Sequence, residues 1–592
     1  MLYSADFETN KGKGFANVWA AGVCEISEGY KFECFNSLEK FIDFMFSCES
    51  GSKFFFHNLK FDSEFIFYYL LKTLKYKVVN KQDEYIHEKE IYALINQQKQ
   101  IYYIKICVSE KPRKYIYIYD SMKIYNMSVE DIAKGFGLPI QKEELDYNIY
   151  REPSIHIITQ KEKKYIENDV KIVAMALKIF FDEGHKKLTI AANAMANYKE
   201  MIGGEKIFRR LFPKLDSKID KILREGYRGG YVYVNPKYKN KILENGIVLD
   251  VNSLYPYVMK SRLLPYGNGE YYTGKYKEDK IYPLYIQYIR CSFKLKKGYI
   301  PTIQIKNNLS FQDNVYLESS NDEELILCLT SVDLKIFLEH YNTYNLIYID
   351  GYKFKGKTGM FDKYIEYWSN KKIQAKKDNN KPLYLISKLF LNSLYGKYGS
   401  AIENITCFPY YDDEKDKIIY KPNARDERDG VYLPMAEFIT AYAREVTITA
   451  AQSNIERYIY SDTDSVHFLG LDDPVNIKID NYELGAFKKE FIWTKGKYIR
   501  QKCYIEEGHE PGKKENELKV TIAGMPYKIH KYVNFSNFNP KTIFTSENKE
   551  EHKKLIDKGY SVVIINDDDS KLRPVHVTGG INLEHVDFTI KI

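Results

Sequence analysis

The sequence predicts a multidomain fold in which an N-terminal α/β part is followed by a larger α+β part. Strand-like apolar runs alternate with helical stretches over about the first 190 residues, which is typical of α/β domains. Farther along, strand-rich stretches flank a Lys-rich pair of helical segments. The length of 592 residues, at about 150 residues per domain, indicates about four structural units.

The length of 592 residues excludes a small disulfide-stabilised scaffold. The composition excludes a disordered or fibrous chain, because 44% of the residues are hydrophobic and 28% are charged. An excess of 88 Lys and Arg over 80 Asp and Glu leaves a net charge of +8, which permits a polyanionic partner without requiring one. The 54 Tyr and 33 Phe residues would suit stacking on nucleic-acid bases. Because Lys, Ile and Asn are also abundant, codon bias in an AT-rich gene is the favoured explanation.

The cysteines and the N-terminus indicate a cytoplasmic protein. The eight cysteines are scattered, and no two have the C-x-x-C spacing of zinc or redox sites, so free thiols are expected. The N-terminus lacks the basic flank and apolar core of a signal peptide, and no stretch approaches the roughly 18 uncharged residues of a membrane span. We therefore expect neither export nor a membrane partner.

The first expected strand, residues 2–8, carries two acidic side chains on one face. Because side chains alternate along a strand, Asp6 and Glu8 point the same way. The same spacing recurs in hydrophilic segments, so taken alone it favours a solvated strand face. Asp62 follows the apolar run 54–58 and precedes an expected helix, and taken singly it favours a helix N-cap.

The last long helix of the N-terminal part is expected to begin at a capping box formed by Thr159 and Glu162. Tyr165 and Asp169 stand four residues apart on this helix and share one face. A phenol and a carboxylate can therefore address one site. An ordinary amphipathic helix is the alternative.

The acidic residues of these elements would repel one another beside apolar strands unless hard cations neutralised them. Ligand sets made only of oxygen favour Mg²⁺ or Mn²⁺ over zinc. This composition is typical of a two-metal nuclease, in which one ion generates hydroxide, the other stabilises the leaving 3′ oxygen and Tyr165 orients the attacking water. The four carboxylates are those of Asp6, Glu8, Asp62 and Asp169.

A domain junction is expected between about residue 187 and residue 230. The polar segment 214–225 leads there to Tyr227-Arg228-Gly229-Gly230, whose paired glycines let the backbone approach a ligand closely.

A second acidic group follows in the α+β part. Asp250 ends an apolar strand, where an unpaired charge is costly, so it needs a cation or a partner. Residues 458–468 predict two apolar strands that meet at a turn containing Asp462 and Asp464. Two unrelated turns with surface aspartates are the less favoured alternative, because apolar residues flank both sites.

A helix between these sites is expected to present a polar stripe. Lys388, Asn392 and Tyr395 occupy positions i, i+4 and i+7, opposite Leu389, Phe390 and Leu394. The stripe would offer a point charge to a triphosphate and an amide and a ring to a base pair. The alternative is a buried amphipathic helix whose lysine extends to solvent.

Three motifs in this order resemble those of family B DNA polymerases: residues 250–256 (DVNSLYP), 388–396 (KLFLNSLYG) and 460–465 (YSDTDS). The N-terminal Asp6-Phe7-Glu8, Asn58-x-x-x-Asp62 and Tyr165-x-x-x-Asp169 are similar to the proofreading 3′-5′ exonuclease motifs of that family. The resemblance therefore covers essentially the whole chain.

The chain looks most similar to the protein-primed branch of this family that is found in small bacteriophages. The compact length, Tyr227-Arg228-Gly229-Gly230 and Lys502-Cys503-Tyr504 support this comparison. Two further stretches resemble the insertions of that branch. The implied fold begins with an RNase-H-like exonuclease domain (1–188) and ends with a thumb and the C-terminal segment (526–592). Between them lies a palm in two parts (189–261 and 432–525). The palm is interrupted by insertion 1 for the terminal protein (262–359), the fingers (360–399) and insertion 2 for strand displacement and processivity (400–431).

The resemblance also implies roles for single residues at the exonuclease site. Asp6, Glu8, Asp62 and Asp169 would hold the metals, and Lys142 and Tyr165 would assist hydrolysis. A frayed 3′ end would be gripped by Thr9, His57, Asn58, Phe61 and Ser121.

At the polymerase site, Asp250, Asp464 and the carbonyl group of Val251 would hold the metals, while direct ligation by Asp462 is left open. Tyr255 would stack under the sugar and exclude a 2′-hydroxyl group. DNA contacts are implied for Tyr227, Gly229, Gly230, Lys502 and Tyr504, and nucleotide contacts for Tyr255, Lys388, Asn392 and Tyr395. A second phosphate-binding lysine is expected among Lys371, Lys372, Lys376 and Lys377, and Lys372 is favoured.

The expected activity is DNA-directed DNA synthesis with 3′-5′ proofreading, using two Mg²⁺ ions per site, with Mn²⁺ as a substitute. Protein-primed initiation and strand displacement on a linear viral genome follow from the resemblance alone. The expected partners are primer-template and single-stranded DNA, deoxynucleoside triphosphates and a terminal protein, with the chain as a monomer or a heterodimer with that protein. The expected location is the cytoplasm of an infected bacterium. A repair-type family B polymerase that uses ordinary primers and a non-catalytic DNA-binding or priming protein are the alternatives.

Overall fold

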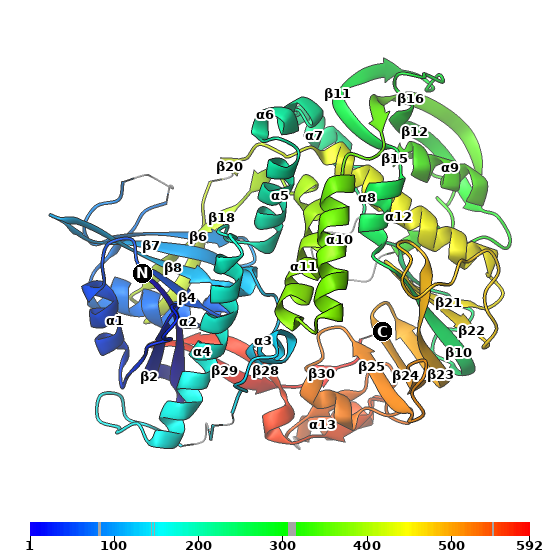
Figure 1. The fold of residues 1–592 in the computed structure, drawn as a ribbon. Helices are drawn as coiled ribbons and strands as arrows, with labels where there is room; N and C mark the ends of the chain where they lie inside the picture. Colours follow the sequence, from blue (N-terminus) through cyan, green and yellow to red (C-terminus); the bar gives the residue numbers. More distant parts are fainter. Residues whose placement is uncertain are drawn as a thin grey trace.

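The computed structural model describes residues 1–12, 14–80, 85–143, 145–146, 149–305, 315–424, 426–547 and 550–591. An N-terminal sheet and a central sheet stand on either side of a pair of helices (Figure 1). The predicted class, an α/β part followed by an α+β part, is confirmed. None of the described helices combines the length and the apolar character that a membrane crossing requires.

The N-terminal sheet has the strand order β19-β18-β6-β7-β8-β4-β1-β2-β3, and β5 pairs with β6 beside this path. Strand β1 lies between antiparallel β2 and parallel β4, so backbone hydrogen bonds hold it along both edges. The strands are β1 (Leu2–Gly12), β2 (Phe15–Glu25), β3 (Phe32–Phe35), β4 (Lys53–Phe56), β5 (Lys77–Val78), β6 (Glu90–Asn96), β7 (Ile101–Glu110), β8 (Arg113–Asp120), β18 (Thr406–Asp412) and β19 (Lys417–Pro422).

Helices cover this sheet on both sides. Helix α4 (Gln160–Asp182) begins at the predicted capping box and packs on β1 and β2. Helices α1 (Leu38–Ser47), α2 (Leu59–Tyr68) and α3 (Val129–Phe136) complete the unit, and α2 continues into a wider helical turn over Tyr69–Thr73. Helices α5 (Ile190–Met201), α6 (Glu205–Leu211) and α7 (Ser217–Arg224) then lead out of it.

The central sheet has the order β25-β24-β23-β10-β22-β21-β9. Its middle strands form a continuous apolar layer with helices α8 (Leu254–Ser261) and α12 (Leu433–Ser453). The strands are β9 (Val232–Val234), β10 (Ile242–Val251), β21 (Tyr458–Asp462), β22 (Ser465–Leu469), β23 (Phe487–Arg500), β24 (Cys503–His509) and β25 (Glu517–Ile522).

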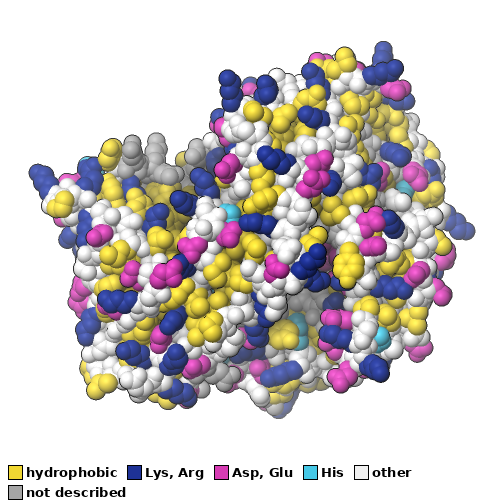
Figure 2. Space-filling view, in the orientation of Figure 1, with side chains coloured by type: hydrophobic (Ala, Val, Ile, Leu, Met, Phe, Trp, Pro, Cys, Tyr) yellow, Lys and Arg dark blue, Asp and Glu magenta, His cyan; other side chains and the backbone are white. Residues whose placement is uncertain are grey.

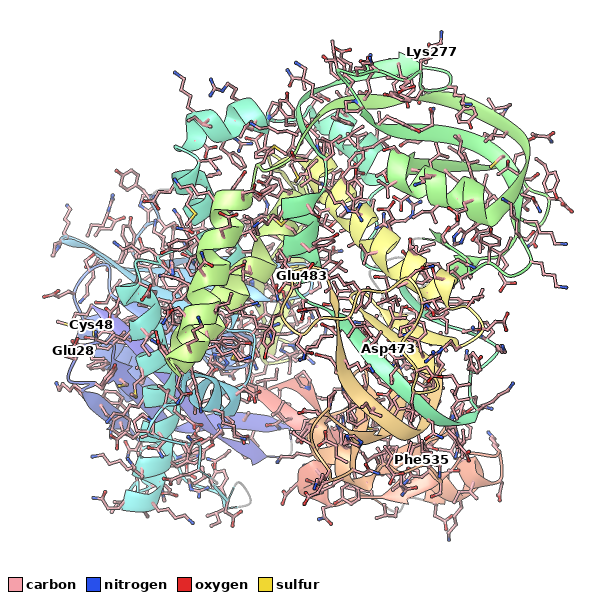
Figure 3. The ribbon with its side chains drawn as sticks, turned by 45° about the vertical axis from the view of Figure 1, so that its right-hand side comes forward. Glu28, Cys48, Lys277, Asp473, Glu483 and Phe535 are labelled. Atoms are coloured by element: carbon pink, nitrogen blue, oxygen red, sulfur yellow. The ribbon has the colours of Figure 1, made fainter. Side chains whose placement is uncertain are left out.

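A third sheet, with the order β11-β16-β12-β15, extends away from the central one with helix α9 (Ser331–His340) against it. In the turned view of Figure 3, Lys277 lies at its outer tip, and Phe535 lies at the other end of the molecule with Asp473 between them. The strands are β11 (Leu264–Thr273), β12 (Leu284–Leu295), β15 (Leu325–Thr330) and β16 (Tyr341–Lys357), and β13 (Ile303–Ile305) pairs with β14 (Val315–Leu317).

The helical pair predicted from the Lys-rich segment consists of α10 (Asp362–Lys377) and α11 (Lys381–Tyr398), which pack on each other. A short pair, β17 (Glu403–Asn404) and β20 (Asp426–Glu427), closes the base of hairpin β18–β19.

The segment after residue 526 shares a core with the central sheet. Ile505 and Ile522 of strands β24 and β25 pack with Phe538, Phe544 and Phe588. The segment contains β26 (Ile543–Thr545), β27 (Val562–Ile564), β30 (Phe588–Thr589), helix α13 (Glu550–Ile556) and the hairpin of β28 (Lys571–Val577) and β29 (Gly580–Val586).

Candidate active sites

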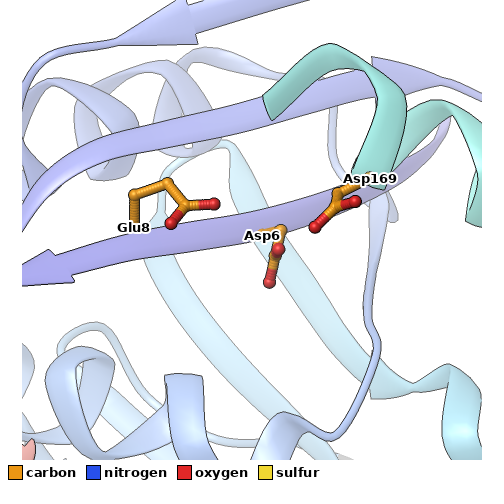
Figure 4. Close-up of side chains that lie close together, drawn as sticks. All are labelled: Asp6, Glu8 and Asp169. Atoms are coloured by element: carbon orange, nitrogen blue, oxygen red, sulfur yellow. The ribbon is translucent and has the colours of Figure 1, made fainter. Parts of the chain in front are cut away.

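The first candidate site lies where strand β1 meets helix α4. Asp6 and Glu8 point to the same side of β1, as the strand periodicity predicts, and Asp169 reaches them from α4 (Figure 4). Each of the three offers a carboxylate oxygen, and these oxygens lie within 4.8 Å of one another. Residues that are more than 160 positions apart in the chain therefore form one acidic cluster.

Asp62 is not the N-cap of α2, so the interpretation favoured for it alone is wrong. The cap position belongs to Asn58, whose backbone is left-handed with φ 72°. The carboxylate of Asp120, at the end of β8, accepts the backbone N–H of Asn58 at 3.1 Å and so satisfies the helix start instead. Asp62 lies in the first turn with 3% of its surface exposed, beyond the closest three-oxygen cluster.

Burial and mutual repulsion raise the pKa values of these carboxyl groups. Burial first, and then Asp169, raise the pKa of Asp6 to about 7. Burial and Asp6 raise the pKa values of Glu8 and Asp62 well above their ordinary range. Among the described residues, one oxygen each of Asp62 and Asp169 is buried without a hydrogen-bond partner. Buried carboxylate oxygens whose negative charge is only partly balanced by neighbouring groups fit a divalent cation such as Mg²⁺ or Mn²⁺.

Lys142 and Tyr165 both reach this cluster through Asp169. The Nζ atom of Lys142 lies 2.6 Å from Oδ2 of Asp169. The Tyr165 hydroxyl group, on a side chain that is 2% exposed, also hydrogen bonds to Asp169. The expected assisting groups are thus beside the carboxylates.

The five residues expected to grip a 3′ end are placed differently. Thr9 and Phe61 line a large cavity of about 2140 Å³ together with Asp6, Glu8 and Asp169. The ring of His57 is held at Nε2 by the Met127 carbonyl, 2.7 Å away, and at Nδ1 by Ser121 Oγ, 3.0 Å away. Ser121 is fully buried, so it contacts His57 and not the cavity, while Asn58 is exposed at the start of α2.

The second candidate site lies on the central sheet. Asp250 near the end of β10, Asp462 at the end of β21 and Asp464 in the turn before β22 line a cavity of about 400 Å³. The turn closes on β10 because the Val251 N–H donates to the Asp464 carbonyl oxygen at 2.8 Å. The backbone of Gly230 lies against Thr463, and a Cβ atom there would be 2.6 Å from its hydroxyl oxygen.

Glu490 is a fourth carboxylate at this site, and the sequence interpretation missed it. Val248 pairs with Phe491 and Leu249 pairs with Lys489, so Glu490 is the extra residue of a β-bulge in β23. In the sequence it is part of the charged run 488–490, which gives no sign of a bulge. Burial, followed by Asp464 and Glu490, raises the pKa of Asp250 to about 8. This all-oxygen set also fits divalent cations.

Residues expected to hold a primer surround the same cavity. The Nζ atom of Lys502 lies 3.3 Å from Oδ2 of Asp462, and its backbone N–H donates to the Tyr460 hydroxyl oxygen at 3.0 Å. Tyr504 lines the cavity with 8% of its surface exposed. Buried Arg444 donates to the carbonyl oxygens of Arg228 and Gly229, at 2.8 Å each, and so holds the glycine-rich loop after Tyr227.

The stripe on α11 is present as predicted. Lys388 and Asn392 are exposed, and the ring of Tyr395 stacks on Tyr255 with centroids 3.9 Å apart. Of the opposite residues, Phe390 and Leu394 are buried and Leu389 is partly buried.

Geometry distinguishes the four candidate lysines of α10. Lys372 Nζ lies 3.5 Å from Ser253 Oγ in the strand-end motif, and burial and the charge of Lys388 lower its pKa. Lys371 instead pairs with Glu183 at 3.1 Å, Lys376 lines the large cavity beside Tyr482, and Lys377 is exposed.

The cavities of the two candidate sites are neighbours. Glu490 and Lys519 line both the large and the small cavity. On the face drawn in Figure 2, basic and acidic side chains are interspersed. Acidic groups, among them those at 567–569, border the large cavity. It is also lined by lysines that could face a polyanion: Lys142, Lys161, Lys376, Lys488, Lys489, Lys519, Lys528 and Lys531.

Comparisons with known proteins agree with the geometry. Residues 151–482 match the family model of DNA polymerase type B, organellar and viral. The chain is 39% identical to the DNA polymerase of Bacillus phage M2 over 100% of this chain and 99% of the relative. It is 33% identical to the DNA polymerase of Streptococcus phage Cp-1, covering 90% and 93% of the two chains.

Solved structures are similar over the whole length. Phi29 DNA polymerase complexed with primer-template DNA and incoming nucleotide substrates superposes with a TM-score of 0.88 at 37% identity, covering 100% of both chains. An orthorhombic crystal form of Phi29 DNA polymerase gives a TM-score of 0.90 at 36% identity. The fold class with an exonuclease and a polymerase part is thereby confirmed, and divalent-metal use is implied by the family. The chain therefore belongs to the organellar and viral family of type B DNA polymerases and is a DNA-directed DNA polymerase of the phi29 type.

Proposed function

We propose that this polymerase synthesises DNA at the central-sheet site and proofreads at the β1–α4 site, starting on a terminal protein and displacing the downstream strand. The observation that carries the proposal is the presence of two separate carboxylate clusters whose cavities share Glu490 and Lys519. The two cavities are therefore neighbours, and a primer end would pass from one cluster to the other along the surface that they share. The parts would follow the boundaries 1–188, 189–261, 262–359, 360–399, 400–431, 432–525 and 526–592.

At the β1–α4 site, Asp6, Glu8, Asp62 and Asp169 would hold two divalent cations, Mg²⁺ with Mn²⁺ as a substitute. Cations at either site supply activation of the attacking oxygen and stabilisation of the leaving oxygen. The Tyr165 hydroxyl group, held on Asp169, orients the attacking water, and the Lys142 ammonium group offsets negative charge on the scissile phosphate. Thr9 and Phe61 bind the frayed end from the cavity wall, and His57 is kept in place by Ser121.

At the central-sheet site, Asp250, Asp464 and the Val251 carbonyl group would hold the cations, with Glu490 in the same cavity. Asp462 is engaged with Lys502, so its first role is to position that lysine on the primer strand beside Tyr504. Lys388 and Lys372 bind the triphosphate. Tyr255, braced by Tyr395, forms the floor under the sugar and excludes a 2′-hydroxyl group.

The proposed partners follow from the relatives. Solved relatives are complexes with primer-template DNA, single-stranded DNA and incoming nucleotides. We assign the same ligands to this chain and a terminal protein as primer at insertion 1, with the chain as a monomer or a heterodimer with that protein. Because the relatives are phage polymerases, its place of action would be the cytoplasm of an infected bacterium.

A repair-type polymerase that uses ordinary primers is the competing function on the same fold. Extension of a labelled primer on a gapped template, with four deoxynucleotides, Mg²⁺ and a downstream blocking strand, separates the two. We expect products that run far past the block. Synthesis that stops at the block would contradict the strand-displacement proposal and favour the repair-type function.

A further inference from the structure

Helix α2 is held by two hairpins from distant parts of the chain. Hairpin β18–β19 continues the N-terminal sheet by pairing with edge strand β6. Hairpin β28–β29 lies against β2 and α2, and Figure 1 shows it in red beside the blue N-terminal strands. The two hairpins also touch each other through β19 and β28. Helix α2 is the element that carries Phe61 and Asp62.

Both hairpins bind one buried carboxylate on α2. Glu64 is 2% exposed. Its Oε1 atom accepts the hydroxyl hydrogen of Tyr420 from β19 at 2.5 Å, and its Oε2 atom lies 3.1 Å from His576 Nδ1 of β28. A carboxylate this deeply buried needs such partners, because an unpaired one is costly.

Hairpin β18–β19 has a further attachment of its own. Asp416, at its turn, accepts hydrogen bonds from Tyr68 at 2.8 Å and Lys72 at 2.5 Å, one and two turns beyond Glu64. This contact would hold β18–β19 on the helix without the other hairpin.

Hairpin β28–β29 is attached independently to the first two strands. Asn582 Nδ2 donates to the carbonyl oxygens of Gly12 at 2.8 Å and Phe15 at 3.0 Å. Gly580 lies on the ring of Phe65, where a Cβ atom would be 2.4 Å from a ring carbon. Among the described hydrogen bonds and ion pairs, Glu64 alone joins both hairpins to α2.

The position of β29 shapes the cavity of the first site. Ile581 and Leu583 line the large cavity together with Thr9, Phe61 and Asp169. A movement of the hairpin would therefore change the wall opposite the bound strand.

We propose that Glu64 is a positioning residue that fastens hairpins β18–β19 and β28–β29 to α2 at one point. The attachment of both hairpins and the placement of Phe61 and Asp62 then depend on the same carboxylate. The catalytic consequence rests on the proposed exonuclease function, whereas the fastening itself does not.

The fastening is tested by hydrogen–deuterium exchange of the full chain. In Glu64→Leu we expect amide exchange over 406–422 and over 571–586 to rise roughly tenfold, because two partly buried side chains, Tyr420 and His576, lose their partner. Glu64→Gln should restore slow exchange, since its amide can accept from Tyr420 and donate to His576. Glu39→Leu, an exposed Glu-to-Leu change on α1, is the matched control and should leave both hairpins unchanged.

Variants of the two partners of Glu64 show whether this one residue holds both hairpins. Tyr420→Phe and His576→Leu should each speed exchange mainly in their own hairpin, and the double variant should be no faster than Glu64→Leu. The double variant carries the test if Glu64→Leu does not fold. The proposal would be overturned if both hairpins of Glu64→Leu exchanged at the wild-type rate. It would also be overturned if combining Glu64→Leu with the double variant added the full effects of both on the exchange rates.

The consequence for activity is measured on single-stranded DNA and on a blocked template. For Glu64→Leu we expect a several-fold higher KM in 3′-end degradation, little change in kcat and shorter displacement products, while simple gap filling stays normal. Faster exchange together with unchanged degradation and displacement would overturn the positioning role. If wild-type enzyme itself degrades no 3′ end, the exonuclease proposal fails and the exchange result still decides the fastening.

Discussion

At the scale of single residues, the protein has two separate sets of carboxylates, one for each of the two proposed reactions, 3′-end degradation and DNA synthesis. Asp6, Glu8 and Asp169 gather within 4.8 Å of one another on the N-terminal sheet, while Asp250 and Asp464 line their own cavity. Removing a carboxylate from one set should therefore leave the other set intact.

For Asp250→Ala we expect DNA synthesis to be abolished while 3′-end degradation continues, because Asp250 belongs only to the central-sheet cluster. The converse variant, Asp6→Ala with Glu8→Ala, should polymerise and leave a mismatched 3′ end intact. Both are measured on one labelled primer-template in Mg²⁺. Full synthesis by Asp250→Ala, or undiminished trimming by the double variant, would contradict the site assignments.

Glu490→Gln should lower the rate of synthesis roughly tenfold or more, since it removes one negative charge from the cavity that Asp250 and Asp464 line. The measurement is single-turnover nucleotide addition over a Mg²⁺ titration, with a shift to higher Mg²⁺ requirement expected. Glu507→Gln, on the exposed side of β24, is the control. An unchanged Mg²⁺ dependence would remove Glu490 from the site.

Tyr255→Val should allow easier insertion of ribonucleotides, because the braced ring that would exclude a 2′-hydroxyl group is lost. The ratio of kcat/KM for deoxynucleotide over ribonucleotide is the quantity to measure. Sugar selectivity equal to that of the wild type would rule out the proposed role.

At the scale of elements, strands β22, β23 and β24 are tied beneath the polymerase cavity by a buried polar group. His467 Nδ1 lies 2.8 Å from Glu506 Oε1 and 3.0 Å from the hydroxyl oxygen of Tyr498, and all three side chains are at most 1% exposed. The Tyr498 hydroxyl group also donates to Glu506. The His467 ring packs on Tyr460 and Tyr504, and the Tyr460 hydroxyl oxygen accepts the backbone N–H of Lys502, the residue proposed to hold the primer.

Glu506→Leu should lower the free energy of unfolding by about 1–3 kcal/mol, because it leaves His467 and Tyr498 buried without their acceptor. Primer-template affinity should fall as well, because Glu506 lies on β24, which also carries Tyr504 and directly follows Lys502. Urea unfolding and binding to a labelled primer-template measure the two effects. Glu506→Gln, which keeps an acceptor, should stay close to the wild type in both.

At the scale of the whole molecule, both carboxylate clusters make the metal-free protein sensitive to pH. Burial and repulsion raise the pKa of Asp6 to about 7 and that of Asp250 to about 8, above their values in the unfolded chain. The folded state thus binds more protons than the unfolded state between about pH 4 and pH 8. The contribution of these groups to the free energy of unfolding is fully present below about pH 4 and is lost as the pH rises through 7 to 8.

The metal-free protein should therefore gain more thermal stability from Mg²⁺ at pH 8 than at pH 5. Scanning calorimetry with EDTA and with Mg²⁺ at both pH values measures the difference in Tm. The combined variant Asp6→Asn with Asp250→Asn should show a much smaller dependence on pH, at about 1.4 kcal/mol per pKa unit removed. An equal Mg²⁺ effect at both pH values would contradict this account.

The sequence by itself determined the local elements and the residue types at both sites. Period-two alternation placed Asp6 and Glu8 together, the capping box marked the start of α4, and the apolar segments around Asp462 and Asp464 predicted a strand pair. Each of these depends on residues close together in the chain, so a pattern can express it.

Only the tertiary structure decided which distant segments meet. It placed Asn58 instead of Asp62 at the N-cap of α2, with Asp120 accepting its backbone N–H. It also inserted Glu490 into the central-sheet cavity through a bulge and joined β18–β19 to the N-terminal sheet. It also placed Lys372, of the four candidate lysines, 3.5 Å from Ser253 and brought Tyr420 and His576 to Glu64. These contacts come from the pairing and packing of remote segments, for which the chain carries no local periodicity.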